Sequence, residues 1–99
     1  MPSSPMLEPQ DVDTWIATHA GWERVSGNSI AKTFKLKDFA AALAFVNEIG
    51  KEADKRDHHP DIELGYGRAR VLWTTHDARG VTQKDLEMAE HTDKTSASR

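Results

Sequence analysis

Histidine is the side chain whose chemistry this sequence offers most plainly, because imidazole can give or take a proton near neutral pH. Two of the five histidines, His58 and His59, are adjacent and are followed by Pro60. A third, His76, ends a segment with the alternation of a strand, and Gly67 predicts a hairpin that returns this segment toward the first two. The three imidazoles could therefore meet at one end of a sheet. Such a group can dehydrate a substrate without a metal, since one ring removes a proton and another protonates the departing hydroxyl.

The same residues allow other interpretations. A His-His-Pro sequence is typical of an exposed turn, and His76 could simply end a surface strand. Neighbouring side chains of an extended segment point to opposite sides, so His58 and His59 reach one pocket only if the chain turns between them. Zinc is a further candidate, with Asp54 and Asp57 as added ligands, although the spacing matches no compact metal motif.

Composition excludes several functional classes. Hydrophobic residues make up 37% of the 99 residues and charged residues 29%, which is typical of one globular domain. The net charge of −3 and the lack of a basic stripe argue against direct nucleic-acid binding, and without cysteine no thiolate chemistry is possible. The longest apolar run, residues 39–46, is too short to span a membrane, and the first residues do not resemble a secretory signal. We therefore expect a cytoplasmic protein. Its limited core makes a homo-oligomer reasonable.

The elements that must position the histidines follow from apolar spacing and turn residues. These patterns predict helices over 9–19, over 38–55 and from 82 onward, and strands over 22–25, 30–36, 62–66 and 69–76. The order is α-β-β-α-β-β-α, with a hairpin in each strand pair. The expected fold class is α+β, a four-stranded antiparallel sheet with three helices packed on one face.

The third helix has a recognisable start. Thr82 occupies the N-cap position, and Asp85 stands three residues later in the position of a capping box, which serves a helix whatever the function. Prolines and serines predict a flexible N-terminus over residues 1–7, and polar composition predicts a disordered tail over 93–99. The predicted domain therefore covers residues 8–92.

These residues also carry a family resemblance. The combination of an acidic residue, His-His-Pro and a later Thr-His-Asp, without gaps, resembles the signature of the pterin-4a-carbinolamine dehydratases. The resemblance covers roughly residues 8–92. Its motif residues are Asp54, His58, His59, Pro60, Asp61, Tyr66, Thr74, Thr75, His76, Asp77, Gly80, Thr82 and Asp85.

The resemblance implies an enzyme that converts 4a-hydroxytetrahydrobiopterin, or a related pterin, into quinonoid dihydropterin and water. Its place would be tetrahydrobiopterin recycling beside an aromatic amino acid hydroxylase, and it would use no metal or organic cofactor. Members form homodimers or homotetramers. By position, His58, His59 and His76 would be catalytic. The implied substrate-binding residues are Asp54, Pro60, Asp61, Thr75 and Asp85.

Two departures from the family pattern, Ile62 and Arg79, leave the preferred pterin side chain open. Two other functions also stay open. Animal relatives serve as dimerisation cofactors of a transcription factor, although the charged residues Glu48, Lys51 and Glu52 favour solvent on the exposed side of helix 38–55. The chain could also bind pterin with little turnover.

Overall fold

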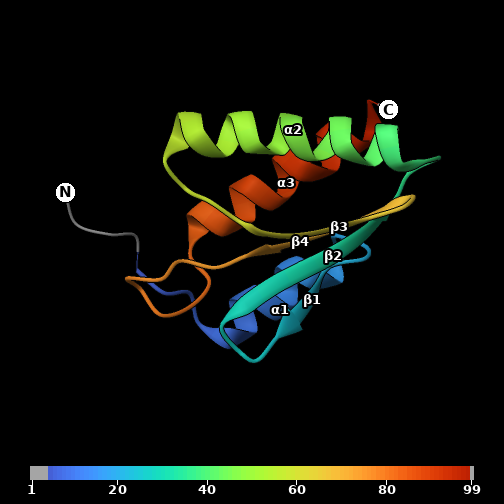
Figure 1. Ribbon diagram of the computed structural model, residues 1–99. Coiled ribbons are helices and arrows are strands. Elements are labelled where there is room, and N and C mark those ends of the chain that lie inside the picture. Colours follow the sequence, from blue (N-terminus) through green and yellow to red (C-terminus); the bar gives the residue numbers. More distant parts are fainter. Residues whose placement is uncertain (1–4, 99) are drawn as a thin grey trace.

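The computed structural model describes residues 5–98 and confirms the predicted element order. Figure 1 shows the long α2 above a twisted sheet, with α3 behind it. None of the helices among these residues combines the length and apolar character that crossing a membrane requires. The elements are α1 (Pro9–Ala17), β1 (Glu23–Val25), β2 (Ser29–Lys35), α2 (Phe39–Arg56), β3 (Asp61–Gly65), β4 (Arg68–Trp73) and α3 (Gln83–Ala97).

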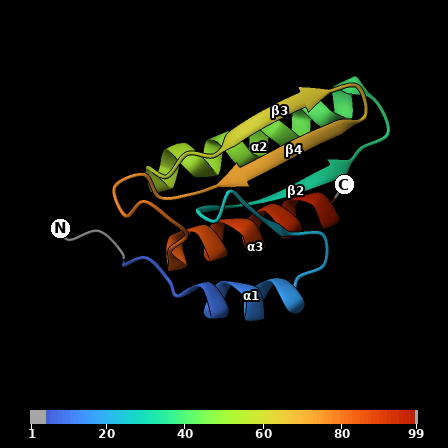
Figure 2. The same cartoon turned by 90° about the horizontal axis from the view of Figure 1, so that it is seen from below.

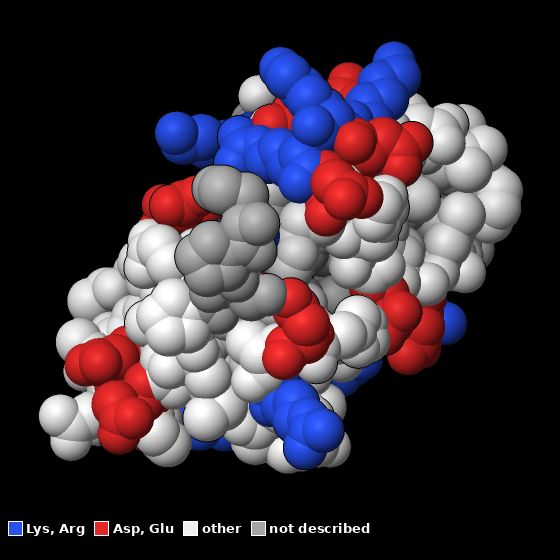
Figure 3. Space-filling model, turned by 90° about the vertical axis from the view of Figure 1, so that its left-hand side faces the viewer, with Lys and Arg blue, Asp and Glu red and all other residues white. Residues whose placement is uncertain are grey.

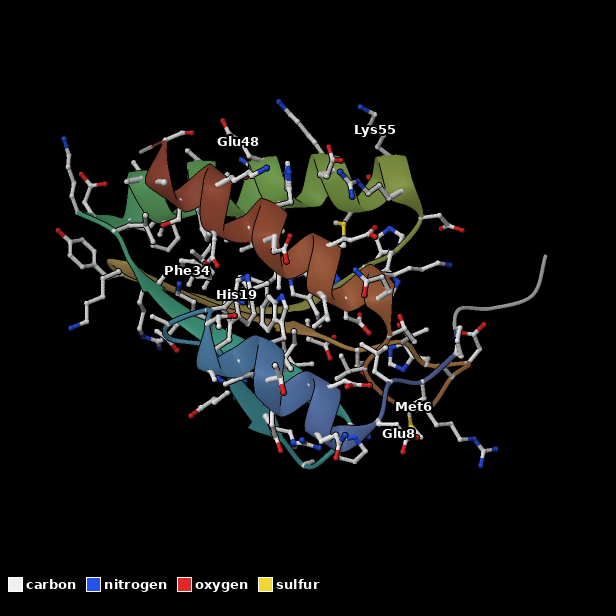
Figure 4. All side chains as sticks on the ribbon, turned by 180° about the vertical axis from the view of Figure 1, so that it is seen from behind. Met6, Glu8, His19, Phe34, Glu48 and Lys55 are labelled. Carbon is white, nitrogen blue, oxygen red and sulfur yellow. The ribbon has the colours of Figure 1, made fainter. Side chains whose placement is uncertain are left out.

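All pairings in the sheet are antiparallel, and the strand order is β1-β2-β4-β3. The register places Ile30 opposite Trp73 and Phe34 opposite Ala69, so the apolar side chains share one face. That face packs against the helices in a single core, which includes Val12 of α1, Phe45 of α2 and Met88 of α3. Seen from below and from behind, α1 and α3 lie side by side (Figures 2 and 4). The α+β class with the helices on one face is thus confirmed.

Lys32 interrupts the apolar alternation of β2, and the structure explains how it is accommodated. Its Nζ lies 2.7 Å from Oδ1 of Asp93 and rests over the rings of Trp22 and Phe34. The indole Nε1 of Trp22 donates to the other oxygen of Asp93 at 3.0 Å. The aliphatic stem therefore covers the edge of the core, while the charge meets a carboxylate and aromatic faces.

The chain ends differ from the predicted boundaries. The helix α3 continues to Ala97, so the predicted disorder over 93–99 is wrong for residues 93–97, and Arg99 lies outside the described residues. The extra turn is fixed by Asp93 and by the burial of Thr95. The predicted flexibility over 1–7 falls partly on residues 1–4, which also lie outside the description. Leu7 packs against the core, and its N–H donates to the carbonyl of Val81 at 2.8 Å.

The last strand is shorter than predicted. The hairpin turns at Gly67, whose φ of +67° suits glycine, but β4 ends at Trp73 and not at residue 76. Beyond it, Thr75 pairs with Gly80 in an isolated bridge. His76 therefore lies in a short loop closed by that bridge and not at a strand end.

Candidate active site

The end of α2 provides the turn that the two adjacent histidines require. Asp57 adopts a left-handed conformation, with φ 51° and ψ 44°, and its N–H bonds back into the last turn of the helix. The N–H of His58 donates to the carbonyl of Ala53 at 3.0 Å, which is the pattern of a Schellman motif. The chain therefore changes direction before His58, which turns inward, while His59 faces solvent.

His58 is held on two sides. Its Nε2 lies 2.6 Å from Oδ1 of Asp85, and its ring is stacked on Trp73 with the two planes 10° apart and the centroids 5.7 Å apart. Its side chain is 12% exposed, and that of Asp85 is fully buried. Because packing and a hydrogen bond both fix the ring, His58 presents a single orientation.

Asp85 is enclosed by donors. Its Oδ2 accepts a hydrogen bond from Oγ1 of Thr75 at 2.7 Å and another from the N–H of Thr82 at 2.8 Å, which is the carboxylate's part of the predicted capping box. An ionised carboxylate can only accept, so the geometry assigns the Nε2 proton to His58. In neutral His58 the lone pair then lies on Nδ1, the nitrogen that a general base uses.

The other two imidazoles are more accessible. Nε2 of His59 lies 2.8 Å from Oδ1 of Asp54, and both side chains are mostly exposed. His76 is exposed in its loop, where its carbonyl accepts from the N–H of Arg79 at 3.1 Å. These rings can reorient toward a ligand more freely than His58 can.

All three imidazoles line one cavity of about 290 Å³, here called the histidine cavity. Three other residues predicted for the site, Pro60, Asp61 and Thr75, line it as well. Asp85 and Asp54 do not: Asp85 is buried behind His58, and Asp54 contacts His59 from the side of α2. The complete lining is Asp57, His58, His59, Pro60, Asp61, Thr74, Thr75, His76 and Asp77.

Trp73 lies under the His58 imidazole, a position that none of the sequence patterns above predicts. Its indole is fully buried, and its Nε1 donates to Oγ1 of Thr92 at 3.2 Å, which keeps the ring flat beneath His58. The signal was present in the alternation of the strand. Trp73 and Thr75 stand two residues apart, so both face the helices, and Thr75 contacts the carboxylate that holds His58.

Basic side chains gather at this end of the molecule. Figure 3 shows Lys and Arg clustered over the carboxyl-terminal end of α2, with carboxylates beside and below them. Arg56, in the last turn, hydrogen-bonds Glu52 and holds the pKa of that carboxyl below its ordinary value of 4.5. Among residues 5–98, no three His, Asp or Glu side chains are grouped as ligands for a metal ion.

Comparison with known proteins agrees with this architecture. The family model described as pterin 4 alpha carbinolamine dehydratase matches residues 5–95. A relative from Thermosynechococcus vestitus, named "Putative pterin-4-alpha-carbinolamine dehydratase", is 41% identical over 83 residues, which is 84% of this chain and 86% of the relative. A relative of the same description from Gloeobacter violaceus is 42% identical over 86 residues, covering 84% of this chain and 94% of its own.

Solved structures give the same result. A transcriptional coactivator/pterin dehydratase from Brucella melitensis superposes with a TM-score of 0.86 at 33% identity, covering 92% of this chain and 98% of that protein. A pterin dehydratase-like protein identified as a RuBisCO assembly factor shares the fold alone, with a TM-score of 0.66 at 16% identity. Matched along nearly its whole length, this chain belongs to the pterin-4a-carbinolamine dehydratase family.

Proposed function

We propose that this chain dehydrates a tetrahydropterin 4a-carbinolamine and that its three cavity histidines do the proton transfers. One observation carries the proposal: His58, His59 and His76, from two separate loops, line one cavity, and the most buried of them is fixed by a buried carboxylate. In this proposal the carbinolamine comes from an aromatic amino acid hydroxylase, and dehydration serves tetrahydrobiopterin recycling.

The reaction removes a proton from N5 and a hydroxyl from C4a, and forms the C4a=N5 double bond of a quinonoid dihydropterin. His58 takes the N5 proton on Nδ1, because Asp85 occupies its Nε2. The imidazolium that results faces a carboxylate, which stabilises the added charge. His76 protonates the hydroxyl, which leaves as water. Its ring serves this role because no described side chain forms a hydrogen bond with it. His59, paired with Asp54 at the exposed margin, binds the pterin and assists the proton transfer.

The decisive variant is His58→Gln, which keeps a side-chain N–H for Asp85 but removes the base. We expect kcat for carbinolamine dehydration to fall by about 10²–10⁴-fold, the range typical of general acid–base catalysis. His91→Gln is the matched control, because His91 lies on α3 outside the cavity and contacts Thr95. Stopped-flow measurement of both variants tests the proposal, and a His58→Gln enzyme as fast as its control would refute it.

We propose in addition that two copies of the chain associate through α2. Phe39 and Leu43 are large apolar side chains of α2, yet they are 46% and 41% exposed. They lie one turn apart. Gly50 follows two turns further along the same face, and there no other part of residues 5–98 comes within 4 Å of an added Cβ. This apolar stripe with a small residue suits a second helix of the same kind. Leu43→Lys should lower the mass measured by light scattering, and an unchanged mass would contradict this assignment.

A further inference from the structure

A second, larger hollow adjoins the histidine cavity on the open face of the sheet. It measures about 510 Å³ and is here called the side hollow. The two hollows share Asp61, Thr74, Thr75 and His76, so a ligand can extend from one into the other. Beyond the shared residues, the side hollow is lined by the β1–β2 turn, by Leu72 and Val25, and by Arg79.

Backbone strain is concentrated around these two hollows. Within residues 5–98, the non-glycine residues with positive φ are Ser26, Asp57 and Arg79, at 55°, 51° and 61°. Asp57 lines the histidine cavity, and Ser26 and Arg79 line the side hollow. Such conformations are uncommon for residues with a Cβ and gather where a ligand is held. The side hollow therefore has the strained backbone that is typical of ligand-binding sites, although no catalytic step proposed above takes place in it.

The polar groups of the two hollows are complementary in kind. Besides its imidazoles, the histidine cavity is lined by three carboxylates, Asp57, Asp61 and Asp77. Carboxylates accept hydrogen bonds, and the pyrimidine edge of a pterin, with its 2-amino group and N3–H, donates them. A ring seated with that edge toward the carboxylates directs its opposite end, at C6, away from them.

The side hollow presents donors. The guanidinium of Arg79 makes no side-chain hydrogen bond or ion pair with any described residue, while its backbone N–H is fixed on His76. Oδ1 of Asn28 accepts from the hydroxyl of Ser29 at 3.1 Å, which leaves the amide N–H groups of Asn28 for a ligand. Ser26 adds a hydroxyl. A cation with neutral donors around it matches an oxyanion.

We propose that the side hollow binds the C6 substituent of the pterin and that Arg79 selects substrates whose substituent carries an anionic group, a phosphate or a carboxylate. The inference rests on the proposed dehydratase function and names the substrate class of the same site. Asp61 lines both hollows, so its carboxylate repels an anion at their junction and favours its placement toward Arg79.

The test compares kcat/KM for three carbinolamines, which carry a 6-methyl group, a 6-dihydroxypropyl group, or the phosphate ester of the latter. We expect the wild type to prefer the phosphate ester over the diol by about tenfold, roughly one charge-assisted hydrogen bond at a partly exposed site. Arg79→Asn should abolish this preference, because asparagine tolerates the left-handed backbone but carries no charge. Arg79→Lys should retain part of it. The 6-methyl rate should stay within about twofold in each variant.

Arg68→Gln is the control. Arg68 lies at the end of β4 that is far from the two hollows, and its loss changes the net charge by the same amount as Arg79→Asn does. A wild type that treats the ester and the diol alike, or an Arg79→Asn enzyme with the wild-type ratio, overturns the inference while 6-methyl turnover still supports the dehydratase. If no substrate turns over, calorimetric binding of the three matching 7,8-dihydropterins to the wild type and Arg79→Asn decides the selectivity separately. Equal affinities would then overturn it.

Discussion

The substitution Asp85→Asn separates the two tasks of the buried carboxylate. The amide keeps the size of the side chain, and its oxygen can still accept from Thr75 and Thr82. Its NH₂ group then faces Nε2 of His58 across 2.6 Å. Two donors cannot share one hydrogen bond, so the imidazole proton must move to Nδ1, and His58 loses the lone pair that serves as base.

The expected magnitudes follow from these contacts. A hydrogen bond to a charged group contributes roughly 1.5–3 kcal/mol, and the two remaining bonds weaken when their acceptor becomes neutral. We expect the free energy of unfolding to fall by about 2–4 kcal/mol, which a domain of ordinary stability tolerates. The loss of the base should lower kcat by about 10²–10⁴-fold. The rate should therefore change far more than the amount of folded protein.

Three measurements check this reasoning: stopped-flow dehydration, denaturant unfolding, and ¹⁵N chemical shifts of the His58 ring, which distinguish its tautomers. Asp38→Asn is the control, because Asp38 also receives a backbone N–H at a helix start, from Ala41, and asparagine replaces it well there. A folded Asp85→Asn enzyme that keeps more than about a third of the wild-type kcat would show that Asp85 does not set the tautomer.

Three further predictions concern stability and titration. Thr92→Val leaves the buried Nε1 of Trp73 without an acceptor, so chemical denaturation should show a loss of about 1–3 kcal/mol, and an unchanged midpoint would mean that the indole finds another partner. Gly67→Ala should cost about 1–2 kcal/mol in the same assay because its φ is positive, and a neutral result would contradict the turn geometry. Glu52 should titrate below 4.5 by carbon NMR, and Arg56→Gln should return it toward that value. Because this pKa is lowered, the contribution of Glu52 to stability is present above pH 4.5 and is lost as the pH falls through the folded-state pKa. A Glu52 titration midpoint that Arg56→Gln leaves unchanged would exclude the ion pair as the cause of the lowered pKa.

The fold could be predicted because local signals agree with it. Alternation in β2, the helical spacing between residues 39 and 53, and glycine at position 67 each specify one element without reference to the rest of the chain. The end of α3 could not be predicted this way. Residues 93–96 are polar, and what orders this last turn is the contact of Asp93 with Lys32 and Trp22, some 60 to 70 residues away.

The site was predicted less completely, for a related reason. The sequence placed His58, His59 and His76 at one end of the sheet, but it could not supply the turn that aims the first two. That turn depends on a left-handed aspartate at position 57, where glycine or asparagine is the usual choice. Nor does any pattern distinguish a capping carboxylate that faces solvent from one sealed beneath an imidazole, as Asp85 is.

The double use of Asp85 has an evolutionary consequence. A lineage that abandoned catalysis would still be under selection to keep this aspartate, since the first turn of α3 and the buried hydroxyl of Thr75 depend on it. The exposed imidazoles of His59 and His76 do not stabilise the fold in a comparable way, so these two residues would be substituted first. Among proteins of this architecture, the presence of the surface histidines, rather than of the buried aspartate, should therefore distinguish active dehydratases from proteins that have lost this activity.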